Sequence, residues 1–251
     1  SSSAILHIYQ DNNRLIWLGT YDGLNIYDGV NIKVYKPDKE KNSLSGNIIK
    51  KIIETKDGVF WLHTNIGLDK FIKDTGIVKP YNREKVNVLC KNKDNHLFSI
   101  TKNDSISIYN PQKDVFEQFS LKGVVREAIA HLSFDTNNII WLITNQGVVN
   151  RYQIITDENT ILKIEKLEPF QYPERVSYAF SKNDMLCLVG INGNLSVVNR
   201  KNGNIQFIRN IRQEMDKYGI ISDIVSDDTD YLISFKTAGV IKLYPNGLGQ
   251  Y

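Results

Sequence analysis

The side chains best suited to metal binding or general-base chemistry in this sequence are its four histidines, His7, His63, His96 and His131. They lie far apart along the chain. None has the His-x-x-x-His or Glu-x-x-His spacing that places two ligands on one face of a helix. We therefore expect no zinc site and no other metal centre.

The sequence gives equally little support for other forms of catalysis. Carboxylates from distant parts of a chain can be brought together to cleave a glycosidic bond, but no pair is marked for that role. The sequence contains no Gly-x-Gly-x-x-Gly and no Gly-Lys-Ser or Gly-Lys-Thr loop for phosphate binding. Cys90 and Cys187 lack a metal-ligand pattern, which favours small buried side chains. We expect no cofactor.

The composition excludes some partners. The 251 residues include 31 basic and 28 acidic ones, and a net charge of +3 is too weak for a nucleic-acid-binding face. The sequence has no apolar run of 18 residues and no basic start followed by an apolar stretch. The chain as given is therefore expected to be soluble, with any signal peptide or membrane anchor outside it.

One recurring phrase indicates how the chain is organised. Its first copy, Ile-Trp-Leu-Gly-Thr-Tyr-Asp-Gly-Leu, occupies residues 16–24, and related copies occupy residues 60–68 and 140–148. The tryptophan serves as an anchor, and a glycine six positions later identifies weaker copies. The six anchors are Trp17, Trp61, Phe98, Trp141, Cys187 and Ile233. Their spacings of 44, 37, 43, 46 and 46 residues indicate six units.

Each unit is predicted to hold four antiparallel strands. In the first unit these cover residues 5–10, 15–20, 24–27 and 32–35, separated by polar turns. Asp-Gly and Asn-Gly suit such turns because one residue must adopt a positive φ. Four-stranded units of this length predict the blades of an all-β propeller. The expected single propeller domain or fragment covers residues 1–251, with approximate blades at 4–36, 47–82, 85–120, 127–168, 175–210 and 219–245. A helical turn or two is expected within residues 208–218.

The conspicuous residues of the phrase are expected to be structural. The tryptophans could form a sugar-stacking platform, but Phe98, Cys187 and Ile233 replace them elsewhere, which favours packing between blades. Threonines three residues after the anchor are expected to bind backbone groups at the strand end. An acidic turn is expected after the first strand of every unit, at Asp11, Asp57, Asp94, Asp135, Asp184 and Asp227.

Residues 8–29 carry the pattern I-x-x-D-x-x-x-x-I-W-L-G-T-x-x-G-L-N-x-Y-D-G. This pattern closely resembles the two-component regulator propeller repeats, which build the sensor regions of hybrid two-component systems in glycan-degrading gut bacteria. The resemblance implies two seven-bladed propellers, an immunoglobulin-like module, a membrane span, a histidine kinase and a response regulator. This chain then corresponds to an amino-terminal propeller fragment with six of seven blades. A genuine six-bladed ring is the alternative.

The resemblance also implies a function. The chain is expected to be a periplasmic sensor segment of an inner-membrane receptor, and not itself an enzyme, whereas the full-length protein is a histidine kinase. Its expected partners are an oligosaccharide ligand, the remaining modules of the same chain and a second receptor copy in a homodimer. The alternatives are a propeller glycoside hydrolase or lyase, which needs clustered carboxylates or a Tyr–His pair at the channel mouth, and a protein-interaction scaffold, which needs an exposed apolar patch.

Candidate ligand contacts follow from propeller geometry. The turn between the second and third strands shares a face with the connections between blades, which is the usual binding surface. Here those turns are rich in amides and carry an aromatic residue, as carbohydrate sites do. They are also ordinary turn residues, so a structural role is the alternative. The ligand-binding candidates are Tyr21, Asp22, Asn65, Asn103, Asn145, Gln146 and Asn192.

Overall fold

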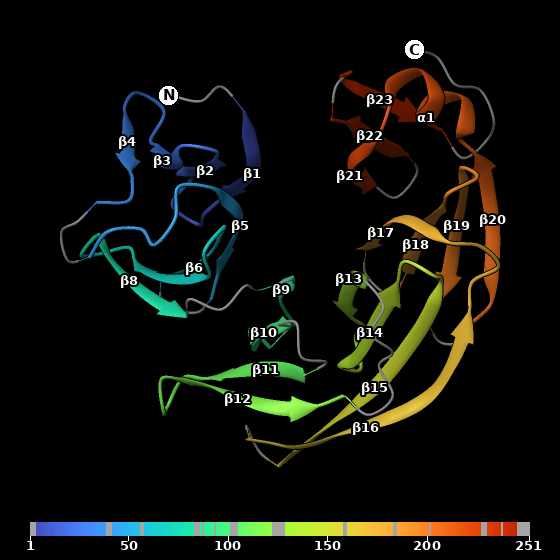
Figure 1. Cartoon of the computed structure of the whole chain (residues 1–251), viewed down its shortest axis with the longest axis horizontal. Coiled ribbons are helices and arrows are strands. Elements are labelled where there is room, and N and C mark those ends of the chain that lie inside the picture. The colour runs from blue at the N-terminus through green and yellow to red at the C-terminus, as the bar shows by residue number, and fades with distance from the viewer. Residues whose placement is uncertain are drawn as a thin grey trace. The chain divides into compact units, whose positions relative to one another are not determined.

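The computed structural model describes residues 4–38, 42–55, 58–82, 86, 88–92, 94–100, 105–121, 129–157, 160–182, 185–200, 202–226, 230–236 and 238–244. The chain is all-β and built from six antiparallel sheets, each formed by consecutive strands, as propeller blades are (Figure 1). It divides into two compact units, Ser1–Leu121 and Lys122–Tyr251. The described part of each unit contains three of the sheets.

Unit one contains three four-stranded sheets. The first is β1 (Ile5–Gln10), β2 (Ile16–Thr20), β3 (Gly23–Tyr27) and β4 (Ile32–Tyr35). The second is β5 (Ile49–Glu54), β6 (Val59–Thr64), β7 (Leu68–Ile72) and β8 (Ile77–Asn82). The third is β9 (Val88–Lys91), β10 (Leu97–Ile100), β11 (Ser105–Asn110) and β12 (Val115–Ser120).

Unit two contains the other three sheets and the helix. The fourth sheet is β13 (Ile129–Phe134), β14 (Ile139–Thr144), β15 (Val148–Asp157) and β16 (Thr160–Gln171), and the fifth is β17 (Val176–Lys182), β18 (Met185–Gly190), β19 (Asn194–Asn199) and β20 (Ile205–Asn210). The helix α1 (Arg212–Tyr218) follows, within the predicted connection. The described part of the sixth sheet is β21 (Ile221–Ser226), β22 (Tyr231–Phe235) and β23 (Val240–Leu243). The long β15–β16 hairpin extends beyond anything that the repeat predicts.

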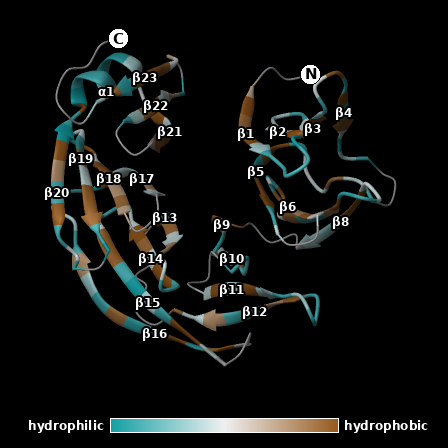
Figure 2. Cartoon of the chain, turned by 180° about the vertical axis from the view of Figure 1, so that it is seen from behind, coloured by the Kyte–Doolittle hydropathy of each residue, from teal (hydrophilic) through white to brown (hydrophobic). Residues whose placement is uncertain are grey.

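The hydrophobic pattern explains which strands of each sheet are buried and which are exposed. Second strands are buried on both faces, as in β6, where five of six residues are buried. Outer strands such as β4 are largely exposed. Figure 2 shows the hydrophobic residues concentrated on the strands. Because the buried second strand of one sheet packs against the neighbouring sheet, adjacent sheets share their hydrophobic cores.

The anchor tryptophans fill these shared cores, as the repeat predicts. Trp17 is fully buried and stacks on Phe60 of the second sheet, with ring centroids 3.8 Å apart and planes inclined by 14°. Phe71, also from the second sheet, meets the same indole edge-on at 5.2 Å. Trp61 and Trp141 are fully buried in equivalent positions. The tryptophans therefore join blades and offer no sugar-stacking platform.

Each of two tryptophans is also held by an aspartate six residues earlier, an arrangement that we call the Asp–Trp clamp. The indole Nε1 of Trp17 donates to Asp11 Oδ2 at 3.0 Å, and that of Trp141 donates to Asp135 Oδ2 at 3.1 Å. The other oxygen of Asp11 accepts the backbone N–H groups of Asn13 and Leu15, both at 2.9 Å. A single buried carboxylate thus shapes the turn and orients the anchor ring.

The turn itself keeps one geometry in four sheets. The residue three positions after the clamp position has a positive φ: 65° at Arg14, 69° at Gly58, 62° at Asn95 and 59° at Asn138. Glycine occupies this left-handed position only once among the four, and asparagine, which tolerates it best among the other residues, occupies it twice.

Asp11, Asp94 and Asp135 lie in the turns after the first strands of their sheets, as predicted, but not all of them occupy the clamp position. The clamp position is aspartate in the first and fourth sheets, but it is Thr55 in the second, Asn92 in the third and Ser181 in the fifth. In the third sheet Asn92 Oδ1 accepts the N–H of His96 at 2.8 Å, so Asn92, and not Asp94, takes the structural place. Asp57, Asp184 and Asp227 lie outside the described residues.

The loss of the aspartate has a visible consequence in the second sheet. Thr55 Oγ1 donates to the carbonyl of Val59 at 3.1 Å and does not reach the indole. Trp61 Nε1 is therefore buried without a hydrogen-bond partner within the described residues. The ring is instead held by packing against Tyr81, Tyr109 and Phe116, at centroid distances of 4.9, 4.7 and 5.5 Å.

We expect Asp11→Ala to lower the free energy of unfolding by about 2–4 kcal/mol, because it strips a buried indole, two turn N–H groups and the Lys73 ammonium of their acceptor. Thr55→Ala is the matched control at the same position of the next sheet. It removes one hydrogen bond and should cost about 1 kcal/mol or less. Urea unfolding of the three proteins measures both values, and equal losses would contradict the Asp–Trp clamp.

A second prediction concerns His63, whose side chain is 7% exposed on β6. Burial, and then the nearby Lys50, lower its pKa from 6.5 to about 4. Between these values the unfolded chain binds a proton that the folded chain does not, so acidification destabilises the fold. His63→Gln removes this group, and the stability lost between pH 7 and pH 4.5 should shrink by about 2 kcal/mol. Unfolding curves of both proteins at the two pH values test this, and an unchanged pH dependence would contradict it.

Candidate functional site

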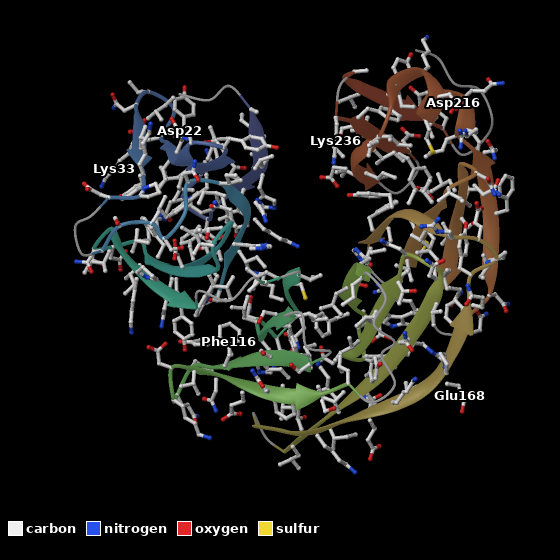
Figure 3. The ribbon with its side chains drawn as sticks, viewed as in Figure 1. Asp22, Lys33, Phe116, Glu168, Asp216 and Lys236 are labelled. Atoms are coloured by element: carbon white, nitrogen blue, oxygen red, sulfur yellow. The ribbon has the colours of Figure 1, made fainter. Side chains whose placement is uncertain are left out.

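The predicted contact residues of the first sheet lie in the exposed turn between β2 and β3. Tyr21 is 48% exposed. Asp22, labelled in Figure 3, forms an ion pair with Lys36 at 2.6 Å, and the hydrogen bond from that lysine lowers the pKa of the carboxyl. Asp22 is thus available to a ligand only in competition with its own partner.

Asn65, in the corresponding turn of the second sheet, has a structural role. Its Oδ1 accepts the backbone N–H of Ile48 at 3.2 Å, and its own N–H donates to the Ile48 carbonyl at 3.0 Å. The preceding residue, Asn47, accepts the N–H of Gly23 at 2.6 Å. Asn47 and Ile48, two consecutive residues just before β5, therefore bind the β2–β3 turn and the β6–β7 turn and bring them together.

Unit two repeats this arrangement. The carbonyl of Asn145 accepts the N–H of Val176 at 3.0 Å, and the N–H of Asn192 donates to Glu174 Oε2 at 3.0 Å. Gln146 has an exposed side chain, and its carbonyl accepts a bond from Gln171 Nε2 at 2.9 Å. Asn103 lies outside the described residues. A ligand role for any of the candidate turn residues stays a prediction.

The threonines of the phrase serve the backbone, as predicted. Thr20 Oγ1 donates to the carbonyl of Gly23 at 2.9 Å and accepts the N–H of Asp22 at 3.0 Å. Thr64 bonds the carbonyl and N–H of Gly67 in the same way. Such fully used hydroxyls are turn elements and not nucleophiles.

The histidines do not gather into a site. His131 Nε2 lies 3.1 Å from Ser181 Oγ, and His96 Nδ1 lies 3.4 Å from Asn92 Nδ2. Among the described residues no group of three His, Cys, Asp or Glu side chains could hold a metal ion.

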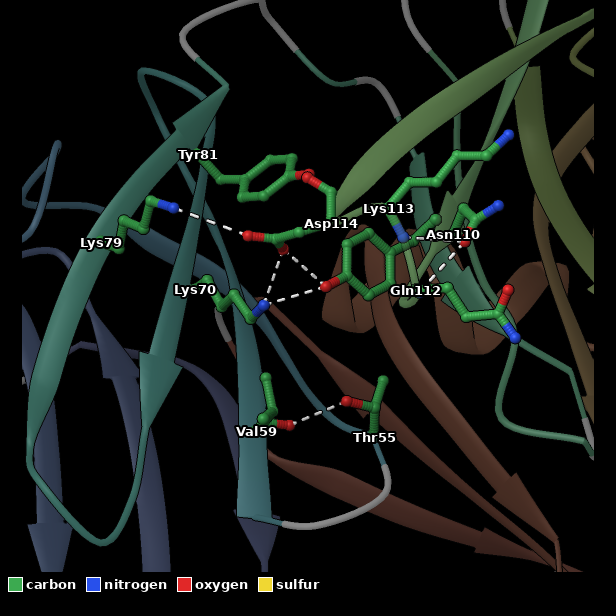
Figure 4. Close-up of polar contacts among 10 residues, drawn as sticks. Thr55, Val59, Lys70, Lys79, Tyr81, Asn110, Gln112, Lys113 and Asp114 are labelled. Carbon is green, nitrogen blue, oxygen red and sulfur yellow. Dashed lines mark hydrogen bonds and ion pairs between the residues drawn. The ribbon is translucent and has the colours of Figure 1, made fainter.

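A polar cluster joins the second and third sheets beside Trp61 (Figure 4). Lys70 Nζ donates to Asp114 Oδ1 at 2.8 Å and to Tyr109 Oη at 2.9 Å, and Tyr81 donates to the Asp114 carbonyl. The ammonium group lies 5.6 Å from the ring centroid of Trp61. Hydrogen bonds from Lys70 and Tyr109 lower the pKa of Asp114. This aromatic enclosure is occupied by a lysine of the chain itself, so it is an inter-sheet contact.

The repeat phrase gives no sign of one further feature, a pocket of about 650 Å³ in unit one. The pocket lies at the ends of the sheets opposite to the candidate turns. At these ends the first strand of a sheet connects to the second, and the third strand connects to the fourth. Its lining includes Tyr9, Asn13, Glu54, Lys73, Lys91 and Asn95. Its volume is in the range of about 300–1,000 Å³ typical of ligand sites. The residues at these positions differ from unit to unit, so a search for recurring residues does not identify them.

Solved structures share the fold over the whole chain. The extracellular domains of two proteins of B. thetaiotaomicron assigned as hybrid two-component systems match 100% of the chain at 16% identity, with TM-scores of 0.73 and 0.74. The chain spans only 35% and 34% of their lengths. Virginiamycin B lyase from Staphylococcus aureus matches 97% of the chain at 14% identity, with a TM-score of 0.68, and 82% of the lyase is covered. Identities this low establish the propeller fold alone.

Sequence comparison adds one specific match. The family model described as "Two component regulator propeller" matches residues 1–22, and no curated protein matches the sequence. In the described part of the chain no helix is long and apolar enough to cross a membrane. The family match thus covers the first repeat, and the propeller fold shared with the solved structures extends over the whole chain.

Proposed function

We propose that this chain is an extracytoplasmic sensor segment of a hybrid two-component receptor, that it lies in the periplasm, and that it contributes to recognition of an oligosaccharide. The observation that carries the proposal is the regulator propeller repeat at residues 1–22, within a fold shared with two extracellular domains of such systems. The propeller is the sensor and not an enzyme. The histidine kinase belongs to the remainder of the full-length protein, together with the other propeller and immunoglobulin-like modules.

The internal contacts of the chain suit a rigid sensing surface. The Asp–Trp clamps and the inter-sheet rings fix the blades, and each described connection ties a turn to the next blade. A ligand that binds one arrangement of a receptor homodimer more tightly shifts the population toward it, by as much as its affinity differs between the two. A stiff blade framework transmits this preference with little loss to internal motion.

The enzyme alternative has less support. It requires clustered carboxylates or a Tyr–His pair, whereas His63, His96 and His131 contact a backbone group, an amide and a hydroxyl. The likeness to a lyase concerns the fold. Tyr9 does contact a carboxylate, Glu54, but burial and that carboxylate raise the pKa of Tyr9 to about 12, which disfavours a phenolate base.

The scaffold alternative predicts an exposed apolar patch, and the first sheet has one. Ile8, Ile32 and Val34 are 61%, 59% and 47% exposed. The strand register places Ile8 and Val34 on one face of the sheet, opposite the face on which Trp17 is buried. In a propeller such a face is the one that an adjacent blade covers, so the patch is no separate evidence for a protein partner.

The test is a glycan-array screen of the complete sensor region, followed by calorimetry of each hit and autophosphorylation of the full-length receptor in membranes. We expect at least one oligosaccharide both to bind and to change autophosphorylation severalfold. Amino acids and nucleotides serve as control ligands. If only a non-carbohydrate ligand triggered the kinase, oligosaccharide sensing would be wrong while the sensor role would stand.

A further inference from the structure

The pocket in unit one has a polar lining drawn from three adjacent sheets. Tyr9 and Asn13 come from the first sheet, Glu54 and Lys73 from the second, and Lys91 from the third. We infer that this pocket binds a neutral sugar residue and that it is the ligand site of unit one, in preference to the turns between second and third strands. The inference rests on the proposed function, because it names where and by what chemistry the oligosaccharide is held.

The polar groups of the pocket are held in place before any ligand arrives. Tyr9 Oη donates to Glu54 Oε2 at 2.8 Å. Lys91 Nζ donates to the carbonyl of Glu54 at 2.7 Å and to Asn95 Oδ1 at 3.1 Å. Lys73 Nζ donates to Asp11 Oδ2 at 2.7 Å, and this lysine is only 19% exposed. Groups already ordered in this way lose little conformational entropy on binding.

These groups also retain unused hydrogen-bonding capacity. A carboxylate has about four lone-pair sites and an ammonium group has three donors, so the contacts above leave both kinds incompletely used. The side-chain amides of Asn12 and Asn13 are exposed and make no hydrogen bond among the described contacts. Paired donors and acceptors on fixed positions are what vicinal sugar hydroxyls require, since each hydroxyl both donates and accepts.

Charge balance favours an uncharged ligand. The lining carries two ammonium groups, Lys73 and Lys91, and two carboxylates, Glu54 and Asp74. Asp11, directly behind Lys73, compensates that lysine further. An anionic sugar would gain little from Lys73, which is already paired with Asp11, and would meet two carboxylates, so the pocket disfavours a uronate or a sulfated residue.

The opposite ends of the same sheets offer less. Asp22 is paired with Lys36 and the Asn65 side chain binds the backbone of Ile48. Gly46 approaches Asn65 so closely that an added Cβ would lie 2.3 Å from its Oδ1, which leaves no room for a ligand atom there. Asp22 and Asn65 at the opposite ends are therefore already engaged, whereas the pocket draws ordered polar side chains from three sheets.

The test measures binding of cellohexaose, xylohexaose, arabinohexaose, mannohexaose and the anionic oligogalacturonate hexamer to the full sensor region by calorimetry. Two pocket variants are compared, Glu54→Gln, which keeps the bond from Tyr9, and Asn13→Ala, which removes an exposed amide. Tyr21→Ala, in the opposite turn of the same sheet, is the matched control. Thermal melts of all variants exclude unfolding as the cause of lost binding.

We expect a neutral hexamer to bind, tenfold or greater weakening with Glu54→Gln, severalfold weakening with Asn13→Ala, and no change with Tyr21→Ala. Neutral binding that only Tyr21→Ala weakens, or that no variant changes, would overturn the pocket while leaving oligosaccharide sensing intact. Preferential binding of the anionic hexamer would overturn the neutral class. If none of the five bound, the pocket inference would fail, and the wider glycan array would decide separately whether oligosaccharide sensing fails as well.

Discussion

The fold depends on how a large ring is held between two sheets. In the first sheet Asp11 fixes the indole of Trp17 through Nε1, and the face of that indole lies on Phe60 of the next sheet. The same carboxylate closes the turn after β1 through two backbone N–H groups. One buried side chain thus couples local turn geometry to packing between blades, and its burial is tolerated because four donors surround it.

A cation from the next sheet completes the arrangement. Lys73, the first residue after the third strand of its sheet, reaches back to Asp11. Arg200, at the equivalent place in the fifth sheet, donates to Ser133 Oγ and the Phe134 carbonyl and lies 5.5 Å from the ring of Trp141. Around Trp61, where the aspartate is absent, Lys70 instead engages Asp114 of the sheet that follows. In each case a cationic side chain therefore connects neighbouring sheets near the anchor tryptophan, although the residues differ.

The sequence predicted the strands and turns closely because they follow from a repeated hydrophobic pattern and from turn chemistry. Trp17, Thr20 and Gly23 were correctly read as structural from their recurrence. Asp94 lies in its turn as predicted, but the pattern of acidic residues did not identify the acceptor there, because a turn requires it at one defined position, and Asn92 supplies it. The pocket could not be foreseen. Glu54, Lys73 and Lys91 are brought together from three blades, and no spacing in the sequence records which side chains meet there.

Under the proposed function, structural support and ligand recognition are assigned to different positions of each repeat. Residues that recur hold blades together, and side chains that do not recur are available to form a site at the blade ends, with Lys73 contributing to both the clamp and the pocket. This separation allows a family of propellers to keep one scaffold while ligand-contacting side chains diverge. It also predicts that the clamp aspartate and its tryptophan act as one energetic unit.

A double-mutant cycle between Asp11→Ala and Trp17→Phe measures that coupling most directly, because phenylalanine keeps an aromatic ring but lacks the indole N–H. We expect a coupling of about 1–3 kcal/mol for this pair. The parallel cycle between Thr55→Ala and Trp61→Phe should give a coupling near zero, since no hydrogen bond joins those side chains. Equal couplings in the two cycles, or no coupling in the first, would contradict the Asp–Trp clamp.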